Sequence, residues 1–294
     1  MPDRITIKTL QRQADRGEKI AMVTAYDAPS TKLAERAGAD ILLVGDSLGM
    51  VVLGYPNTLS VTLDDMLHHI KAVARVSQHA LVIGDMPFMS YQVSAEQAVS
   101  NAGRLIQEGG THAVKLEGGA RIAGQIQKII DAGIPVMGHL GLTPQSIHQF
   151  GGYKVQGKTA EAARQMVADA HLLESLGCFA LVLECVPSDL AAHIARDLTI
   201  PVIGIGAGQE VDGQVLVFHD LLQFGTEYAP KFVRAYADLN ESVPAAIAAF
   251  VRDVKAGTFP SSDEAYAPTQ AVLEALEAIA TQVEHDASQG KGEN

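Results

Sequence analysis

Short apolar runs alternate along this chain with longer amphipathic stretches. The run at 41–45, ILLVG, has no polar interruption, a pattern typical of strands that are covered on both faces of a parallel sheet. Runs of this kind predict strands at 20–25, 41–45, 80–84, 112–117, 134–139, 179–184, 201–205 and 215–218.

Between these runs, apolar residues recur at helical spacing. The predicted helices are at 7–16, 30–38, 62–78, 94–108, 121–132, 159–176 and 188–197, with terminal helices at 243–255 and 268–285. Strand and helix alternate about eight times without a Pro- or Ser-rich linker. The pattern therefore predicts an α/β protein, a single (β/α)8 TIM-type barrel with an N-terminal helix and a C-terminal helical extension. A dinucleotide-binding sheet is disfavoured, because no G-x-G-x-x-G follows the first strand.

The composition is that of a globular protein. Hydrophobic residues make up 47% of the 294 positions, and no apolar run reaches the roughly 18–20 residues that span a bilayer. The first residues lack the apolar segment of a secretory signal, which predicts a cytoplasmic protein. The formal net charge of −12 argues against a nucleic-acid partner but leaves anionic small molecules open. Two cysteines, Cys178 and Cys185, are too few for a disulfide framework.

Polar residues stand where the predicted strands end. They are Asp46, Asp85, Lys115, Glu117, His139 and Glu184. In a barrel the carboxyl ends of the strands share one rim, so these side chains are expected to converge. Acids brought together repel unless a cation lies between them, and carboxylate oxygens favour Mg²⁺ over zinc. Taken alone, however, Asp46 equally fits a turn or a helix cap.

The strand at 112–117 carries its charges on one face. Side chains alternate across a strand, so Lys115 and Glu117 share one face while Val114 and Leu116 share the other. We expect the apolar pair to face the helices and the charged pair to face the barrel interior. Buried charges need a partner, which here is a metal, a ligand or simply each other as a structural ion pair.

The same alternation places Glu184 on the inward face of its strand. A lone carboxylate in a partly apolar pocket is a candidate catalytic base, although a glutamate at a strand end also caps loops. His139 is a candidate accessory residue or a purely structural group. The glycine-rich segment 204–208 could cradle a phosphate or let the backbone approach another ligand. The long loop at 140–158 is a candidate lid.

Eight motifs in order resemble the ketopantoate hydroxymethyltransferase family. They are VTAYD at 23–27, LLVGDSLGM at 42–50, DMPFMSY at 85–91, VKLEGG at 114–119, GHLGLTPQS at 138–146, GGYKVQGK at 151–158, LVLECVP at 181–187 and PVIGIGAG at 201–208. The likeness runs from about residue 4 to about 266. It predicts a barrel catalytic domain at 1–266, followed by a C-terminal helix and loose tail at 267–294 with an open role.

The resemblance implies a site and a reaction. It matches Asp46 and Asp85 to direct Mg²⁺ ligands and Glu117 to a third acid that acts through water. It matches Asp46, Ser47, Asp85 and Lys115 to substrate binding, and Glu184 to the proton acceptor. The family transfers a hydroxymethyl group from 5,10-methylenetetrahydrofolate to 3-methyl-2-oxobutanoate through a Mg²⁺-stabilised enolate, giving ketopantoate for pantothenate biosynthesis. Family members assemble as homodecamers.

Two other readings fit the same residues. One is a different metal-dependent barrel enzyme acting on α-keto acids, such as a carbon–carbon lyase or a relative of phosphoenolpyruvate mutase, which would not require folate. The other is a non-catalytic binding protein on the same fold, because a fold does not fix a function. The sequence does not locate a folate pocket.

Overall fold

The computed structural model describes residues 4–226 and 230–289. Eight parallel strands close into a barrel in which each strand pairs with the next in sequence and β8 pairs with β1. The strands are β1 (Ile20–Thr24), β2 (Ile41–Val44), β3 (Leu81–Asp85), β4 (Ala113–Glu117), β5 (Val136–Gly141), β6 (Ala180–Glu184), β7 (Val202–Ile205) and β8 (Gly213–Leu216). The predicted barrel is thus confirmed, with strand ends that differ from expectation by one or two residues.

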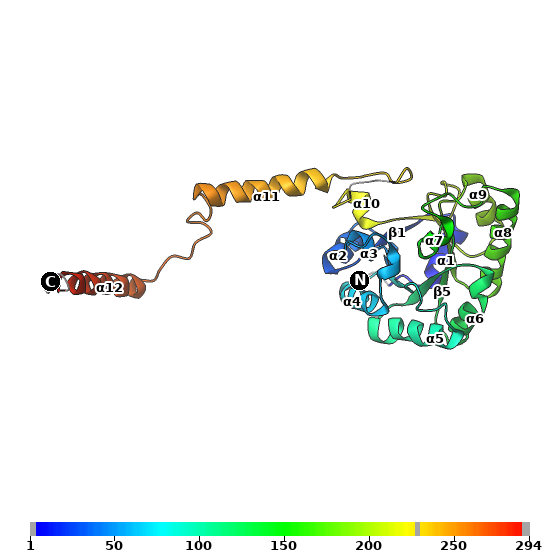
Figure 1. Ribbon diagram of the computed structural model, residues 1–294, viewed down its shortest axis with the longest axis horizontal. Helices are drawn as coiled ribbons and strands as arrows, with labels where there is room; N and C mark the ends of the chain where they lie inside the picture. The colour runs from blue at the N-terminus through cyan, green and yellow to red at the C-terminus, as the bar shows by residue number, and fades with distance from the viewer. Residues whose placement is uncertain (1–3, 227–229, 290–294) are drawn as a thin grey trace. The chain divides into compact units, whose positions relative to one another are not determined.

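Helices surround the barrel, with α4, α5, α6 and α8 visible along its outside in Figure 1. The helices are α1 (Ile7–Asp15), α2 (Ala28–Arg36), α3 (Leu48–Val51), α4 (Leu63–Val76), α5 (Ala95–Arg104), α6 (Ala123–Asp131), α7 (Ile147–Phe150), α8 (Ala160–Ser175), α9 (Ser188–Asp197), α10 (Phe218–Leu222), α11 (Leu239–Ala256) and α12 (Gln270–Gln289). Short 3₁₀ turns lie at η1 (Thr58–Ser60), η3 (Ala120–Ile122) and η4 (Pro144–Ser146), and α5 continues into the π-helical turn η2 (Leu105–Gly109).

The alternation of side chains along the strands produces two apolar cores. One fills the barrel interior and includes Ile41 and Leu43 of β2. The other lies between the strands and the helices and includes Leu42 and Val44. Because β2 contributes to both, its uninterrupted apolar run is explained by burial on both faces. Leu10 of α1 is fully buried in the interior core, so the N-terminal helix contributes to the packing inside the barrel.

The seam between β1 and β8 closes the barrel. Ile20 lies opposite Gly213, and Met22 lies opposite Val215. A Cβ atom at position 213 would lie 2.5 Å from the Ile20 carbonyl oxygen and 2.6 Å from Ile203 Cδ1. The seam therefore requires a residue without a side chain at this position, because the two strands approach too closely for any other.

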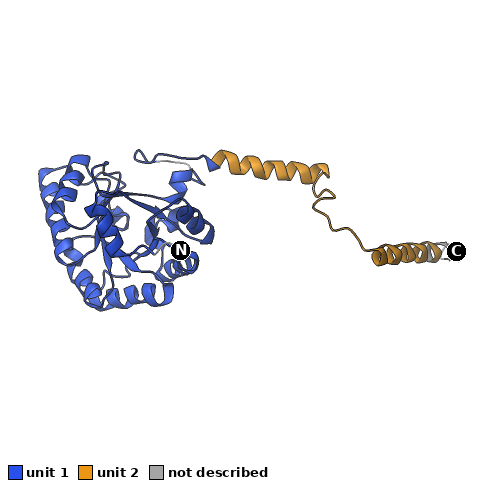
Figure 2. Cartoon of the chain, turned by 180° about the vertical axis from the view of Figure 1, so that it is seen from behind, with its two compact units in different colours: residues 1–239 blue, residues 240–294 orange. Residues whose placement is uncertain are grey.

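The chain divides into two compact units, Met1–Leu239 and Asn240–Asn294, which Figure 2 distinguishes by colour. The first contains the barrel. The second contains α12 and nearly all of α11, a helix with no buried side chain. The domain boundary predicted at 266 lies inside the second unit, and the predicted C-terminal helix corresponds to α12. Among the helices of the described residues, none is both long and apolar enough to cross a membrane.

Candidate active site

The register of neighbouring strands gathers the polar side chains at the carboxyl ends of the barrel. Asp85 of β3 lies opposite Lys115 of β4, and Glu117 of β4 lies opposite His139 of β5. As the alternation predicts, Val114 and Leu116 pack in the core beneath the helices. Leu181 and Leu183 of β6 do the same, which leaves Glu184 on the other face. The predicted convergence of strand-end residues is therefore observed.

Lys115 forms its ion pair with Asp85, and not with Glu117, which was one of the alternatives that the sequence left open. Its Nζ donates to Asp85 Oδ1 at 2.7 Å, and both side chains are almost fully buried. The alternative of a Lys115–Glu117 structural pair is thus incorrect, because strand register places Asp85 beside Lys115. The backbone N–H of Asp46 donates to the other Asp85 oxygen at 3.4 Å, which connects the ends of β2 and β3.

His139 lies between two glutamates. Its Nδ1 is 3.3 Å from Lys115 Nζ and 3.6 Å from Glu117 Oε1. Its Nε2 is 3.3 Å from Glu184 Oε2, a contact with the distance of an ion pair but without hydrogen-bond geometry. Burial and Lys115 lower the pKa of His139, but the contacts with Glu117 and Glu184 outweigh them and raise it to about 9. Glu184 is consequently not the lone carboxylate expected from its strand, and His139 belongs to the cluster.

The cluster contains more carboxyl groups than basic side chains. Burial raises the pKa of Asp46 well above its usual range, and the charges of Asp85 and Glu117 raise it further, against Lys115. Burial also raises the pKa of Asp85, although Lys115 opposes the effect. Burial lowers the pKa of Lys115, but the surrounding acids more than reverse this. Such an arrangement favours the binding of a further cation among the carboxylates.

Two residues of the cluster have no signal in the strand pattern. Gln145, in η4, donates from Nε2 to Asp46 Oδ2 at 2.9 Å, and its backbone N–H donates to Glu117 Oε2 at 3.0 Å. The hydroxyl of Tyr91, in the loop after β3, lies 2.8 Å from Gln145 Oε1 and 3.1 Å from the Glu117 carbonyl oxygen, and its single proton is donated to one of these acceptors at a time. Both residues lie inside motifs quoted above. Because they are uncharged and lie in loops, however, their spacing in the sequence does not indicate a role.

Ser47 sits at the mouth, directly after Asp46. Its Oγ lies 2.8 Å from the hydroxyl of Tyr26, a buried residue that follows β1. The neighbouring glycines are explained by crowding. A Cβ at Gly45 would lie 2.9 Å from Ser47 Oγ, and one at Gly49 would lie 2.5 Å from Val61 Cγ2. Close packing, and not a left-handed turn, therefore accounts for both glycines.

The strand end that carries Glu184 is tightly constrained. Cys185 has a φ of 48°, a left-handed conformation that is strained for a side chain other than glycine. The Glu184 carbonyl accepts a hydrogen bond from the Leu142 amide at 2.8 Å. Gly141, opposite Glu184 in the register, has a φ of 93°, and a Cβ there would collide with the same carbonyl.

Gly141→Ala is expected to destabilise the protein, because its backbone conformation alone costs about 1–3 kcal/mol and the collision adds to it. Thermal denaturation should show a lower melting temperature. Gly124→Ala is the matched control, since Gly124 lies in α6 with nothing within 4 Å of an added Cβ. That change should leave stability unchanged or raise it by about 0.5–1 kcal/mol. Equal melting temperatures for the two variants would contradict the packing argument.

The loop after β5 reaches the mouth of the barrel. It is more ordered than predicted, since it contains η4 and α7. Partial burial raises the pKa of Tyr153, and the charges of Glu184, Asp46 and Glu117 add to the effect. The Tyr153 hydroxyl donates to Met50 Sδ at 3.4 Å, so the loop contacts the segment that follows β2. At the GIGAG segment, Gly206 and Gly208 have left-handed φ values of 64° and 84°, and added Cβ atoms would meet Phe232 and Ser188, so backbone conformation and close packing together explain both glycines.

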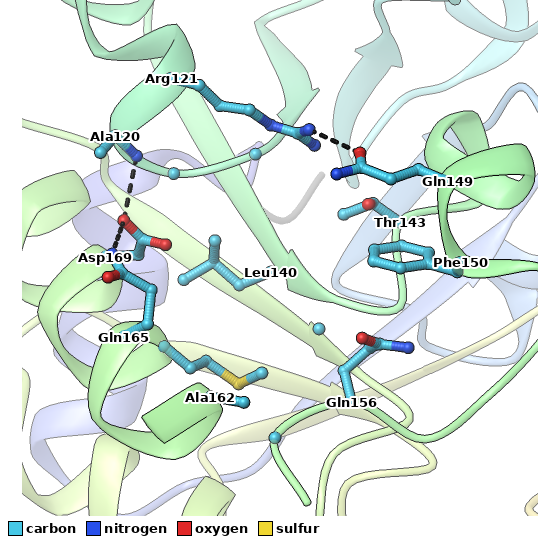
Figure 3. A pocket seen from close by; sticks show the side chains of 15 residues that line it. Ala120, Arg121, Leu140, Thr143, Gln149, Phe150, Gln156, Ala162, Gln165 and Asp169 are labelled. Atoms are coloured by element: carbon cyan, nitrogen blue, oxygen red, sulfur yellow. Dashed lines mark hydrogen bonds between the residues drawn. The ribbon is translucent and has the colours of Figure 1, made fainter. Parts of the chain in front are cut away.

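Two cavities of about 480 Å³ adjoin the cluster without containing Asp46, Asp85, Lys115 or Glu184. Figure 3 shows the first, where the Arg121 guanidinium reaches the Gln149 amide and Asp169 accepts from the Ala120 N–H. Leu140, which belongs to the core beneath the helices, also lines it, so this cavity lies outside the barrel wall. The second cavity is bordered by Glu117 and Gln145, beside the carboxylates.

A closed parallel barrel whose strand ends gather buried acids, a lysine and a histidine defines an α/β-barrel enzyme. The family model described as ketopantoate hydroxymethyltransferase matches residues 4–262. The chain belongs to the ketopantoate hydroxymethyltransferase family, and it is accordingly a transferase.

Curated relatives agree with this assignment. A protein of Carboxydothermus hydrogenoformans is 53% identical over 93% of this chain and 99% of its own length. One of Moorella thermoacetica is 56% identical over 90% of this chain and 98% of its own length. Both are named 3-methyl-2-oxobutanoate hydroxymethyltransferase.

Solved structures show the same fold at low sequence identity. A 2,3-dimethylmalate lyase of the PEP mutase/isocitrate lyase superfamily has a TM-score of 0.57 at 17% identity, covering 98% of this chain and 100% of the lyase. Phosphonopyruvate hydrolase in complex with oxalate and Mg²⁺ has a TM-score of 0.58 at 14% identity, covering 95% of this chain and 97% of the hydrolase. At these identities the likeness concerns the fold alone.

Proposed function

We propose that this chain transfers a hydroxymethyl group from 5,10-methylenetetrahydrofolate to 3-methyl-2-oxobutanoate, giving 2-dehydropantoate (ketopantoate) for pantothenate biosynthesis. The observation that carries the proposal is the buried cluster of Asp46, Asp85, Glu117 and Glu184 with Lys115 in a chain more than half identical to a named enzyme of this kind. The proposal includes the homodecamer and the cytoplasmic location that the resemblance implies.

The donor chemistry of the cluster fits Mg²⁺. Hard carboxylate oxygens are the ligands that this ion prefers, and Mg²⁺ keeps several water molecules when it binds to proteins. No three His, Cys, Asp or Glu side chains converge on one ion position within residues 4–226 and 230–289. A site in which Asp46 and Asp85 bind directly and Glu117 acts through water needs no such convergence. When bound, Mg²⁺ supplies Lewis-acid polarisation of the keto group.

Lys115 and Ser47 are the proposed holders of the substrate carboxylate. Lys115 is the one lysine in the described cluster, and its buried Nζ already contacts Asp85 Oδ1 at 2.7 Å. A charge-assisted hydrogen bond to a substrate carboxylate would use the remaining donors of this ammonium group. Ser47 Oγ, held by the Tyr26 hydroxyl, is half-exposed at the mouth and adds a neutral donor.

Glu184 is the proposed base that removes the C3 proton of 3-methyl-2-oxobutanoate. Its side chain is 16% exposed, against 3% for Asp85, so it is the more accessible to a substrate. The Nε2 atom of His139 lies 3.3 Å from Glu184 Oε2, so an imidazole stands beside the proposed base. The deprotonated C3 carbon forms a bond to the methylene carbon of the folate donor as the bond from that carbon to one folate nitrogen breaks, and this nitrogen takes up the proton that Glu184 removed. Water then replaces the second folate nitrogen: its hydroxyl remains on the methylene carbon and its proton goes to the nitrogen, which gives ketopantoate and tetrahydrofolate.

A coupled assay for ketopantoate tests the whole proposal. Purified protein with 3-methyl-2-oxobutanoate, 5,10-methylenetetrahydrofolate and Mg²⁺ should form ketopantoate. Omission of the folate donor, or chelation of the metal, should remove the activity. Turnover of the keto acid without folate would instead indicate a lyase or mutase activity, which other proteins with this fold carry. If the keto acid were not converted at all with both Mg²⁺ and the folate donor present, the protein would more readily be explained as a non-catalytic binding protein.

A further inference from the structure

Gln145 contacts two of the three carboxylates proposed to hold the metal. Its side-chain Nε2 donates to Asp46 Oδ2 at 2.9 Å, and its own backbone N–H donates to Glu117 Oε2 at 3.0 Å. The residue is only 5% exposed, so water does not compete for these contacts. A single loop residue therefore connects the end of β2 to the end of β4.

The neighbours of Gln145 leave its amide one orientation. The Nε2 side faces two acceptors, Asp46 Oδ2 and the Met86 carbonyl, each at 2.9 Å. The Oε1 side faces two donors, the Tyr91 hydroxyl at 2.8 Å and Gln92 Nε2 at 3.2 Å. An inverted amide would place its oxygen against two acceptor oxygens, those of Asp46 and Met86, and its NH₂ group against Gln92 Nε2. All four hydrogen bonds of the amide are thus satisfied together.

These contacts occupy one oxygen of each acid, and the two acids differ in what faces the other oxygen. Within the described residues, no donor reaches Asp46 Oδ1, whereas Oδ2 is bound by Gln145. Glu117 Oε2 accepts a hydrogen bond from the backbone N–H of Gln145, and Glu117 Oε1 lies 3.6 Å from His139 Nδ1. Groups that fix the orientation of metal-binding carboxylates in this way generally set the affinity of the site.

We propose that Gln145 is a positioning residue that orients Asp46 and Glu117 for the metal and the keto acid, and so joins the loop after β5 to the reaction centre. The proposal rests on the function proposed above. It also accounts for how the loop that carries Tyr153 is fixed at the mouth. Gln145 connects the segment to the acids, and the Arg121 guanidinium, which donates to Ser146 Oγ at 3.1 Å, holds its outer side.

The test is Gln145→Met, which keeps the approximate size of the side chain and removes all four hydrogen bonds of the side-chain amide, while the backbone N–H of residue 145 can still donate to Glu117. The probe is Mn²⁺, whose binding is followed by electron paramagnetic resonance with and without 3-methyl-2-oxobutanoate. We expect the metal to bind 10–100-fold more weakly, with a higher KM for the keto acid, while the melting temperature shows that the variant is folded. Hydrogen exchange should also become faster at residues 142–150.

Gln149→Met is the matched control, since Gln149 lies four positions further on, is exposed, and accepts a hydrogen bond from Arg121 without contacting the acids in the described part of the chain. It should bind Mn²⁺ as the wild type does. Wild-type affinity in folded Gln145→Met would overturn the inference. If that variant does not fold, Tyr91→Phe is the second test, because it removes the hydroxyl that holds Gln145 Oε1 and that also contacts the backbone of Glu117. It should weaken Mn²⁺ binding at least threefold, and unchanged affinity overturns the inference. Failure of the wild type itself to bind Mn²⁺ and the keto acid would contradict the proposed function instead.

Discussion

Glu184→Gln is expected to slow exchange of the C3 proton of 3-methyl-2-oxobutanoate by about 10²–10⁴-fold, the contribution typical of a positioned general base. A glutamine amide has nearly the shape of the carboxylate but cannot accept a proton under these conditions. The residue can still contact His139, which lies 3.3 Å from the carboxylate. Binding of the keto acid should therefore change much less than the rate of exchange.

The exchange is measured by proton NMR in deuterated water, with Mg²⁺ present and the folate donor omitted, so that only the deprotonation step is observed. Glu108→Gln is the matched control, since Glu108 is exposed and pairs with Arg104 on the surface. That variant should exchange the proton at the wild-type rate. If Glu184→Gln also exchanges at the wild-type rate, another group is the base.

Asp85→Asn is expected to weaken Mg²⁺-dependent binding of the keto acid by at least a hundredfold, which corresponds to about 2.7 kcal/mol. The change removes a negative charge from the proposed metal position while it keeps an oxygen and the approximate shape of the side chain. Asparagine is preferable to alanine here. Truncation would leave the buried Lys115 charge without its 2.7 Å partner, and an unpaired buried charge costs about 3–5 kcal/mol in stability.

Isothermal titration of the keto acid, with Mg²⁺ and then with a chelator, measures the effect. Asp64→Asn makes the same chemical change at an exposed position that pairs with Arg104, and it should leave binding unaltered. If the Asp85 variant kept wild-type Mg²⁺-dependent affinity, Asp85 would not be a metal ligand, and its role would reduce to pairing with Lys115.

The alternation of side chains along a strand was enough to predict which residues face inward. Val114 and Leu116 pack beneath the helices, and Lys115 and Glu117 belong to the mouth, because adjacent residues of a strand point to opposite faces. The barrel itself followed from repeated strand–helix units, and its closure is confirmed. These features depend on local sequence, which is why they could be predicted from it.

The partners within the cluster could not be predicted in the same way. Lys115 pairs with Asp85 and not with Glu117, because the register between β3 and β4 is a property of the assembled sheet. His139 approaches Glu184 from the preceding strand for the same reason. Gln145 comes from a loop, where no periodicity constrains the position of a side chain. Contacts that cross between strands and loops therefore require the structure.

The seam between β1 and β8 has a consequence for how the chain folds during synthesis. Strands β2 to β6, which carry the proposed acids, emerge from the ribosome before β8, and each pairs with a neighbour that is close in sequence. Strand β1 can pair with β8, its second neighbour, only after Gly213 has been synthesised, because Ile20 lies opposite Gly213 in the register. Pairing between such distant positions slows folding. Until then β1 has an open edge that another chain could pair with, so substitution of Gly213 should promote aggregation of newly made chains.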